Sequence, residues 1–340
     1  MTRNTTKRPV IVVTGFLGSG KTTLLRSILS APSMEYTAVL VNEFGKVGLD
    51  HHLLRKVDEN IRLLGGGCLC CTVREDLVKA LLDLLDMDQR GMIKLERVII
   101  ETSGLADPAP ILFTVLTDPI LQHHFYIECV IVTIDAVNGH LHLDHQPESI
   151  KQVVVADKII VTKTDLVTSE DVENLSTRLH SINPTAKIIK SVYGDVDVHS
   201  IFNSIEEHDK SLIYQENKHE NNLYQHLPKT RSISLTFDQP LDWIAFGLWL
   251  SMLLHARGQD VLRVKGLIDV GDTGPAVLNG VQHIIHPPEH MDSWPSDDYR
   301  SHVIFIMRSI DPQEILISLQ AFQKILGAKA NLLEITNVHV

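Results

Sequence analysis

The segment from Gly15 to Thr22 carries the residue types and the spacing of a phosphate-binding loop. It reads Gly-Phe-Leu-Gly-Ser-Gly-Lys-Thr, matches G-x-x-x-x-G-K-[ST], and lies between an apolar run and a helical stretch, which is the context that the pattern requires. Glycines let backbone N–H groups surround a phosphate chain, Lys21 neutralises the β and γ oxygens, and the Thr22 hydroxyl is a ligand for Mg²⁺. A nucleoside triphosphate site is therefore predicted. The alternative is a glycine-rich turn that binds nothing.

Glu101 stands where a second Mg²⁺-binding group is needed, at the end of the apolar run Val98–Glu101. We predict that it acts on the metal through a bound water, as a catalytic and a metal-binding residue. Gly104 is predicted to direct its backbone N–H at the γ-phosphate and to register the loss of that group on hydrolysis. A glutamate that only ends a strand is the alternative. In the phosphate-binding loop the predicted nucleotide contacts are Gly15, Gly18, Ser19, Gly20, Lys21, Thr22 and Thr23, of which Lys21 is also catalytic and Thr22 also binds metal.

The segment Thr162-Lys163-Thr164-Asp165 follows another apolar run and is predicted to select the base. The Asp165 carboxylate accepts hydrogen bonds from guanine N1–H and N2–H, each contributing roughly 1.5–3 kcal/mol, whereas adenine turns a lone pair toward it. Lys163 is predicted to lie along the base plane. Many GTPases have Asn where Thr162 stands, and this difference loses at most one neutral hydrogen bond of about 0.5–1.5 kcal/mol. GTP is therefore favoured over ATP, with a polar strand-to-helix turn as the alternative.

Three of the four cysteines lie within four residues, as Cys68, Cys70 and Cys71, and follow three glycines. Clustered thiols of this kind are typical of a site for a soft, tetrahedrally coordinated metal, and three thiols alone do not rank zinc against cobalt or nickel. Adjacent side chains of an extended segment diverge, so Cys68 with one or both of the others, completed by a carboxylate, histidine or water, is the expected ligand set. No second cysteine pair is available to close a Cys₄ site, which favours an open, exchangeable one. Buried, inert cysteines are the alternative.

Histidine is frequent, and the tract from His140 to His145 is the densest group. In an extended segment His140, His142 and Asp144 share one face, which predicts a second, weaker metal site. Histidines that are merely exposed to solvent are an equally supported interpretation.

Short apolar runs rich in β-branched residues alternate with helical stretches from Val10 to about Ser204. This order is typical of an α/β fold in which helices cover both faces of a parallel sheet, as in P-loop NTPases. The predicted strands are Val10–Thr14, Thr37–Val41, Val98–Glu101, Ile127–Ile134, Lys158–Thr162 and Lys187–Lys190. The predicted helices are Thr22–Ser30, Val73–Met87, Ser149–Val155 and Ser169–Ser181. The last two begin at serines able to cap them.

Residues 206–229 are polar and are predicted to link a domain of residues 1–205 to a second domain of residues 230–328. The second domain has the order strand, helix, three strands, helix, which indicates a smaller α+β domain with an antiparallel sheet and its helices on one face. Its predicted elements are Thr230–Phe237, Leu241–His255, Val261–Val270, Val277–Ile285, Val303–Met307 and Pro312–Leu326.

Composition narrows the class of protein further. The 340 residues agree with two domains, and the formal charge of −11 repels a phosphodiester backbone, so no nucleic-acid partner is expected. No apolar run approaches the ~20 residues that span a bilayer, and the apolar start is too short for a secretory leader. Cysteines with metal-site spacing suit a reducing compartment. We therefore expect a cytoplasmic protein without a membrane partner; its sequence is compatible with a homodimer.

These motifs, in this order, resemble the CobW family of P-loop GTPases, relatives of the urease and hydrogenase nickel chaperones. The resemblance is carried by Gly15–Thr22, Asn42–Gly45, Gly66–Cys71, Glu101–Pro108, Thr162–Asp165, Leu262–Gly266 and Gly280–Gln282. It implies that Asn42–Asp50 is the first switch, with Glu43 or Asp50 near the γ-phosphate and Asp50 as a catalytic residue. Many relatives have an acidic residue where this chain has Lys46. If that carboxylate helps to fill a metal site, this chain must use another ligand, and Asp50, His51 and His52 are the nearest candidates.

The resemblance implies a GTP-hydrolysing metallochaperone that binds zinc at the Cys-x-Cys-Cys motif and couples hydrolysis to metal transfer to a client metalloprotein. The predicted cofactors are GTP, Mg²⁺ and Zn²⁺. Two other functions remain open: a cobalt insertase for cofactor or metalloenzyme assembly, and a zinc-binding adaptor with a non-hydrolysing nucleotide site. A P-loop kinase is a weaker alternative, because no arginine-rich lid helix is found in the sequence.

Overall fold

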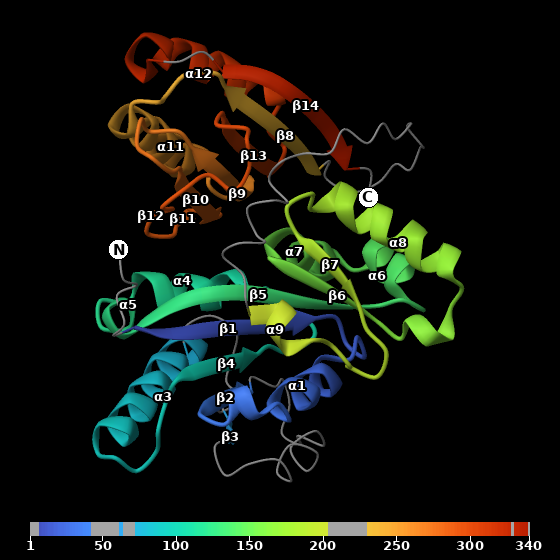
Figure 1. The fold of residues 1–340 in the computed structure, drawn as a ribbon. Coiled ribbons are helices and arrows are strands. Elements are labelled where there is room, and N and C mark those ends of the chain that lie inside the picture. Colours follow the sequence, from blue (N-terminus) through green and yellow to red (C-terminus); the bar gives the residue numbers. More distant parts are fainter. Residues whose placement is uncertain (1–6, 42–60, 64–71, 203–229, 328–329, 339–340) are drawn as a thin grey trace. The chain divides into compact units, whose positions relative to one another are not determined.

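The structure is a computed structural model that describes residues 7–41, 61–63, 72–202, 230–327 and 330–338 (Figure 1). The chain divides after Phe202 into two compact units, except that residues 178–187 are grouped with the second unit. Among the described residues, no helix combines the length and the apolar composition needed to cross a bilayer.

The first unit is built on a seven-stranded sheet with the order β3-β2-β4-β1-β5-β6-β7. Its strands are β1 (Arg8–Gly15), β2 (Thr37–Val41), β3 (Ile61–Leu63), β4 (Arg97–Glu101), β5 (Phe125–Asp135), β6 (Lys158–Thr162) and β7 (Lys187–Lys190). The pairings of β1 with β4 and β5, of β2 with β3 and β4, and of β5 with β6 are all parallel. Every residue of β2 and β6 is buried, as a sheet covered on both faces requires. The predicted α/β class is confirmed.

Helices cover this sheet from both sides. They are α1 (Lys21–Leu29), α3 (Thr72–Gln89), α4 (Ala109–Thr117), α5 (Leu121–His124), α6 (Gly139–His145), α7 (Pro147–Val155), α8 (Ser169–Ile182) and α9 (Val198–Phe202). The chain moves from β1 toward one edge through α1 and returns toward the other edge through α3, α4 and α7. Right-handed crossovers therefore place α1 on one face and these three helices on the other. Leu24, Leu25 and Ile28 of α1 are fully buried in a core that also contains Cys129.

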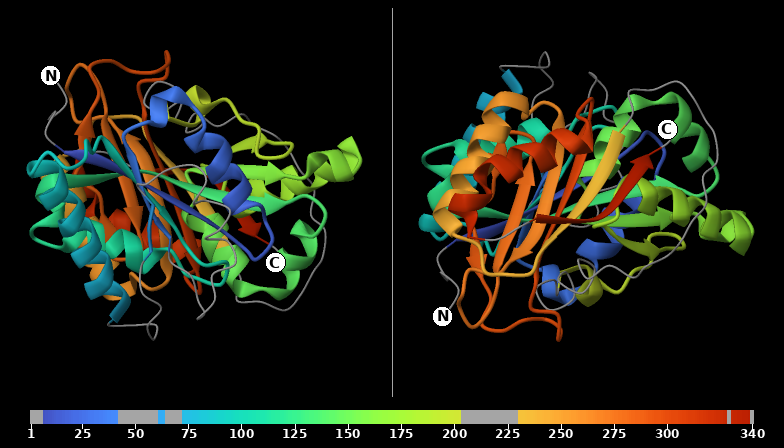
Figure 2. Two further views of the ribbon diagram at one scale, coloured as in Figure 1. Left: turned by 90° about the horizontal axis from the view of Figure 1, so that it is seen from below. Right: turned by 90° about the horizontal axis from the view of Figure 1, so that it is seen from above.

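The second unit is an antiparallel sheet with the order β11-β10-β9-β13-β8-β14, and β12 pairs with β10. Its elements are β8 (Thr230–Phe237), α11 (Trp243–Arg257), β9 (Val261–Ile268), β10 (Ala276–Val281), β11 (Ile284–Ile285), β12 (Glu289–His290), β13 (Ser301–Arg308), α12 (Pro312–Leu326) and β14 (Ala330–Val338). The right-hand view of Figure 2 shows α11 and α12 across one face of the sheet. Asp242 and Asp311 cap these helices by accepting from Ala245 N and Gln313 N at 2.9 Å. The predicted antiparallel α+β unit is confirmed.

Several predicted details differ from the structure. Helix α7 begins at Pro147, so Ser149 does not cap it but lies fully buried inside it. The proline fixes φ at a value suited to the first helical position, which sets the start two residues earlier. The sequence also did not indicate α4, because a short apolar run such as Ala109–Thr117 fits a strand as well as a helix. Strand β14, which pairs with β8, was likewise not predicted.

Candidate nucleotide and metal site

The phosphate-binding loop joins the end of β1 to the first turn of α1. Gly15 has a φ of +142°, and a Cβ there would lie 2.3 Å from Thr133 Oγ1, so only glycine lets the loop approach β5 this closely. The Ser19 hydroxyl is buried and shares a hydrogen bond of 2.6 Å with the same Thr133 oxygen. These contacts hold the loop in front of the N-terminus of α1, where backbone N–H groups and the helix dipole favour an anion.

Lys21 is the first residue of α1, and its ammonium group lies against the loop. Its Nζ donates to Gly15 O at 2.8 Å and to Phe16 O at 3.1 Å. The positive charge is thereby held beside the loop that the phosphates are predicted to enter. Contact of this charge with the β and γ oxygens stays a prediction, as do the other predicted nucleotide contacts.

Thr22 and Glu101 are 79 residues apart in the sequence, yet the fold brings them together. Thr22 Oγ1 donates to Glu101 Oε1 at 3.0 Å. Strand β4 pairs with β1 so that Glu101 stands opposite Val13, which carries the carboxylate to the loop, where it is only 5% exposed. Hydroxyl and carboxylate oxygens are the hard ligands that Mg²⁺ prefers. The two residues therefore fit the metal site predicted for them.

The loop after β4 packs directly on the phosphate-binding loop. A Cβ on Gly104 would lie 2.6 Å from Leu17 N, so no side chain fits between the two loops. Thr102 adds a hydrogen bond of 2.7 Å from its hydroxyl to Thr14 Oγ1. This packing puts Gly104 at the edge of the predicted phosphate site, which is where a contact between its N–H and the γ-phosphate would form.

The predicted base-selecting segment follows β6 and is tied to the phosphate-binding loop. The Thr162 hydroxyl donates to Ser19 O at 2.7 Å, so its direct partner is the loop backbone. Lys163 has a φ of +57°, and Asp165 is exposed at the start of the following turn. The fold thus places Lys163 and Asp165 at the same edge of the sheet as the loop; the contacts predicted for these three residues with GTP remain predictions.

Asp135 is a member of this site that the sequence did not indicate. It ends β5 as Glu101 ends β4, and its side chain is 2% exposed. Its Oδ2 accepts from Lys163 Nζ at 2.7 Å and from Asn138 Nδ2 at 3.0 Å, and its Oδ1 accepts from Val137 N at 2.8 Å. Burial opposes ionisation of this carboxyl, but the three hydrogen bonds outweigh burial and hold the pKa of Asp135 below its ordinary value. Asp135 therefore stays ionised and fixes Lys163.

The histidine tract does not form the metal site that an extended segment would have provided. Residues 139–145 are the helix α6, so His140, His142 and Asp144 do not share one face. The His142 ring instead packs on Phe16 of the phosphate-binding loop, with ring centroids 4.5 Å apart. Burial lowers the pKa of His142. No group of three or more metal-ligating side chains is present within the part of the chain that the structure describes.

Four of the predicted site residues lie outside the described residues: Asp50, Cys68, Cys70 and Cys71. The first switch predicted for Asn42–Asp50 lies outside them as well. The described chain resumes with α3, whose first residue, Thr72, follows the cysteine motif directly.

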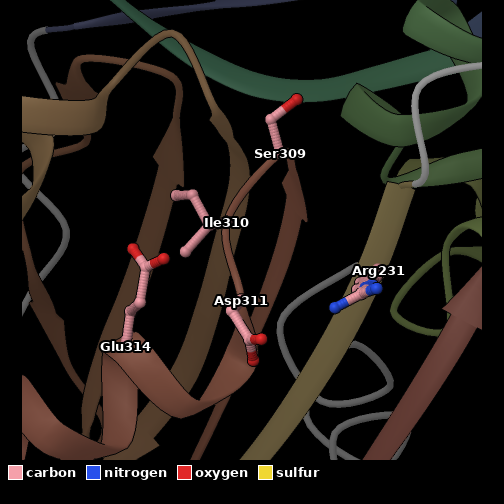
Figure 3. A pocket seen from close by; sticks show the side chains of 5 residues that line it. All are labelled: Arg231, Ser309, Ile310, Asp311 and Glu314. Atoms are coloured by element: carbon pink, nitrogen blue, oxygen red, sulfur yellow. The ribbon is translucent and has the colours of Figure 1, made fainter.

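A hollow in the second unit lies at the start of α12, and Figure 3 shows its side chains. It is lined by Arg231, Ser309, Ile310, Asp311 and Glu314. Asp311 caps α12, and Glu314 pairs with Arg257 at 3.3 Å. Both acidic side chains thus have structural roles, and we assign no ligand to this hollow.

A phosphate-binding loop after the first strand of a parallel sheet, with a Thr–Glu pair beside it and the Thr-Lys-Thr-Asp turn after β6 at the same edge, is the arrangement of a P-loop GTPase. Comparison with known families gives the particular class. The family model described as "CobW/HypB/UreG, nucleotide-binding domain" matches residues 9–190, and that of the "Cobalamin synthesis protein cobW C-terminal domain" matches residues 230–323. The chain belongs to the CobW family of P-loop GTPases, whose nucleotide and metal at this site are GTP and Mg²⁺.

Individual relatives extend over nearly the whole chain. The zinc chaperone YjiA of Escherichia coli is 32% identical over 93% of this chain and 98% of its own length. The zinc-regulated GTPase metalloprotein activator 1 of Schizosaccharomyces pombe is 30% identical over 81% of this chain and 75% of its own. The crystal structure of Zn(II)-bound YjiA GTPase from E. coli superposes with a TM-score of 0.68 at 29% identity, covering 93% of this chain and 99% of that one.

The contact between Asp135 and Lys163 leads to a prediction about nucleotide affinity. Replacing Asp135 by Asn removes the charge that fixes Lys163, and we expect binding of GTP and of GDP to weaken alike, by about tenfold, because both share the base. Titration with fluorescent nucleotides measures both constants. In the matched test, Lys163→Ala should weaken binding to a similar extent, and the double variant should be little worse than either single one. Additive losses would mean that the pair does not act as a unit.

Proposed function

We propose that this protein is a GTP-driven zinc metallochaperone that holds Zn²⁺ at Cys68, Cys70 and Cys71 and couples GTP hydrolysis to metal transfer to a client metalloprotein in the cytoplasm. Zinc is the cargo, and GTP with Mg²⁺ supplies the energy and the timing. Two observations support this proposal. The chain matches the zinc chaperone YjiA over almost its whole length, and the cysteine motif has the thiol ligands that Zn²⁺ prefers.

The observation that carries the coupling is the packing of α3 against α4. Helix α3 begins at Thr72, directly after the cysteine motif, and α4 begins at Ala109, directly after the loop that contains Gly104. Arg74 in the first turn of α3 lies over the Phe113 ring of α4, 5.4 Å from its centroid. A change in the loop that contains Gly104 therefore passes through the contact between α4 and α3. Helix α3 is the helix that follows the cysteine motif.

The residues of the nucleotide site have separate roles in the proposed cycle. Thr22 and, through a bound water, Glu101 would hold Mg²⁺, which would supply positive charge to the phosphates. Lys21 neutralises charge on the β and γ oxygens, and Gly104 responds to the presence of the γ-phosphate. Loss of that phosphate removes its contact with the Gly104 N–H, the change passes through α4 to α3, and the cysteine motif changes its affinity for zinc.

The test is GTP hydrolysis by the purified, metal-free protein with and without one equivalent of Zn²⁺, and with ATP as the control nucleotide. We expect turnover that is selective for GTP, because adenine offers the Asp165 carboxylate no donor at the matching position, and that changes when zinc binds. Equal use of ATP would contradict the role of Asp165. Indifference to zinc would contradict the coupling, and a response to Co²⁺ alone would favour the cobalt insertase. GTP binding without turnover would favour the adaptor.

A further inference from the structure

Helix α7 carries two polar side chains in a position where the fold otherwise buries apolar ones. Ser149 and Gln152 are both 0% exposed, as is Val153 beside them. A fully buried amide is costly unless hydrogen bonds replace those it made with water, so its partners reveal why it is there.

The partners of Gln152 are two backbone carbonyls of the loop after β4. Its Nε2 donates to Gly104 O at 3.2 Å and to Ala106 O at 3.0 Å. One side chain thus uses both of its amide protons to hold carbonyls two residues apart, which fixes the path of the loop between them. A second tie comes from the same helix, because Lys151 Nζ lies 3.8 Å from Asp107 Oδ2.

The position fixed by Gln152 is the close approach of Gly104 to the phosphate-binding loop. A Cβ on Gly104 would lie 2.6 Å from Leu17 N, so this loop has almost no freedom toward the phosphate-binding loop. From the other side, Gln152 holds the carbonyl of Gly104 itself. The peptide group of Gly104 is therefore clamped between the phosphate-binding loop and α7.

The hydrogen bonding around Gln152 is incomplete, which argues against a purely structural role. Within the described part of the chain, the buried atoms Gln152 Oε1, Ser149 Oγ and Ser103 Oγ have no hydrogen-bond partner. An apolar side chain of similar size at position 152 would avoid that cost. It would also leave the Gly104 and Ala106 carbonyls without their donor, so what glutamine adds at this position is the placement of the loop.

We propose that Gln152 is a positioning residue for GTP hydrolysis: it sets the Gly104 peptide so that its N–H meets the γ-phosphate. This inference rests on the contact between Gly104 and the γ-phosphate in the proposed function. Gln152 does not touch the nucleotide, and it acts through the Gly104 and Ala106 carbonyls. GDP lacks the γ-phosphate. A substitution of Gln152 should therefore change the affinity for GTP and the rate of GTP hydrolysis, and should leave the affinity for GDP unchanged.

The test compares the wild type with Gln152→Met, which keeps the length and packing of the side chain but has no donor. We expect hydrolysis in a single turnover to slow about tenfold and affinity for a non-hydrolysable GTP analogue to fall a few-fold, with affinity for GDP unchanged. The matched control is Ser149→Ala, one turn away on α7, whose hydroxyl has no partner among the described residues. This control should hydrolyse GTP at the wild-type rate.

Two results with Gln152→Met would contradict a positioning role. Wild-type hydrolysis by Gln152→Met would overturn the proposal, and so would an equal loss of affinity for GDP and for the GTP analogue, which would show a merely structural role. If the Met variant does not fold, Gln152→Asn keeps the amide but is one methylene too short to reach both carbonyls, and the same expectations apply. Absence of turnover in the wild type would instead contradict the proposed function itself.

Discussion

Replacing Lys21 by alanine is expected to lower the rate of GTP hydrolysis by about 10²–10³-fold while zinc binding stays unchanged. In the fold, the Lys21 ammonium donates to Gly15 O at 2.8 Å and to Phe16 O at 3.1 Å. The variant therefore loses both the charge that is predicted to stabilise the transferring phosphoryl group and two hydrogen bonds that hold the phosphate-binding loop. Phosphate release measures the hydrolysis, and competition with a chromophoric chelator measures the zinc affinity.

The converse variant makes the separation of the two sites testable. Cys68→Ala removes one predicted thiolate from the zinc site, and we expect zinc affinity to fall while metal-free GTP hydrolysis continues at the wild-type rate. For the Lys21→Ala variant, the control is Lys21→Arg, which retains the positive charge but not the shape of the ammonium group. Loss of both activities in either Lys21→Ala or Cys68→Ala would contradict a modular arrangement in which nucleotide and zinc occupy separate sites.

The parts of the site that the sequence predicted are those defined by neighbouring residues. A phosphate-binding loop needs glycines, a lysine and a hydroxyl at fixed spacing, so Gly15–Thr22 is recognisable without knowledge of the fold. The strand β4 is nearly all apolar and ends in a single carboxylate, which singled out Glu101. That its Oε1 accepts from Thr22 follows once β4 and β1 are neighbours in a parallel sheet.

The parts that the sequence did not predict depend on partners far along the chain. Asp135 is functionally informative only because Lys163, 28 residues later, reaches it. Gln152 donates to backbone carbonyls 46 and 48 residues earlier. Every residue has such a carbonyl, so the sequence does not indicate which ones Gln152 contacts. A signal did exist in both cases. A carboxylate ends a buried strand at Asp135, and an amide interrupts an apolar helix face at Gln152, and each is costly to bury without a partner.

For the histidine tract, the prediction of a metal site is wrong because it assumed an extended segment. Alternate residues share a face in a strand but not in a helix, and residues 139–145 form a helix. Short segments of mixed polarity carry too few turns for their period to be recognised. His142 consequently acquires a different role, because it packs on Phe16 and links α6 to the phosphate-binding loop.

Glu101→Gln is the variant that separates nucleotide binding from hydrolysis most directly. Glutamine keeps the size of the side chain and an oxygen that accepts from Thr22 Oγ1, which lies 3.0 Å from Glu101 Oε1. It removes the negative charge that is predicted to hold Mg²⁺ through a bound water, so we expect hydrolysis to fall by about 10²-fold or more. GTP should still bind, because the phosphate-binding loop and the turn predicted to select the base are unaltered. Phosphate release at several Mg²⁺ concentrations is the measurement.

The Mg²⁺ dependence decides whether the loss arises at the metal. If Glu101 helps to hold Mg²⁺, the variant needs a higher Mg²⁺ concentration to reach half of its own maximal rate, whereas damage elsewhere lowers the rate at every concentration alike. Thr22→Ser is the matched control, because it keeps the hydroxyl ligand and loses only a methyl group, and its Mg²⁺ dependence should equal that of the wild type. An unchanged Mg²⁺ dependence in Glu101→Gln would place the carboxylate outside the metal site, and its contact with Thr22 would then be structural.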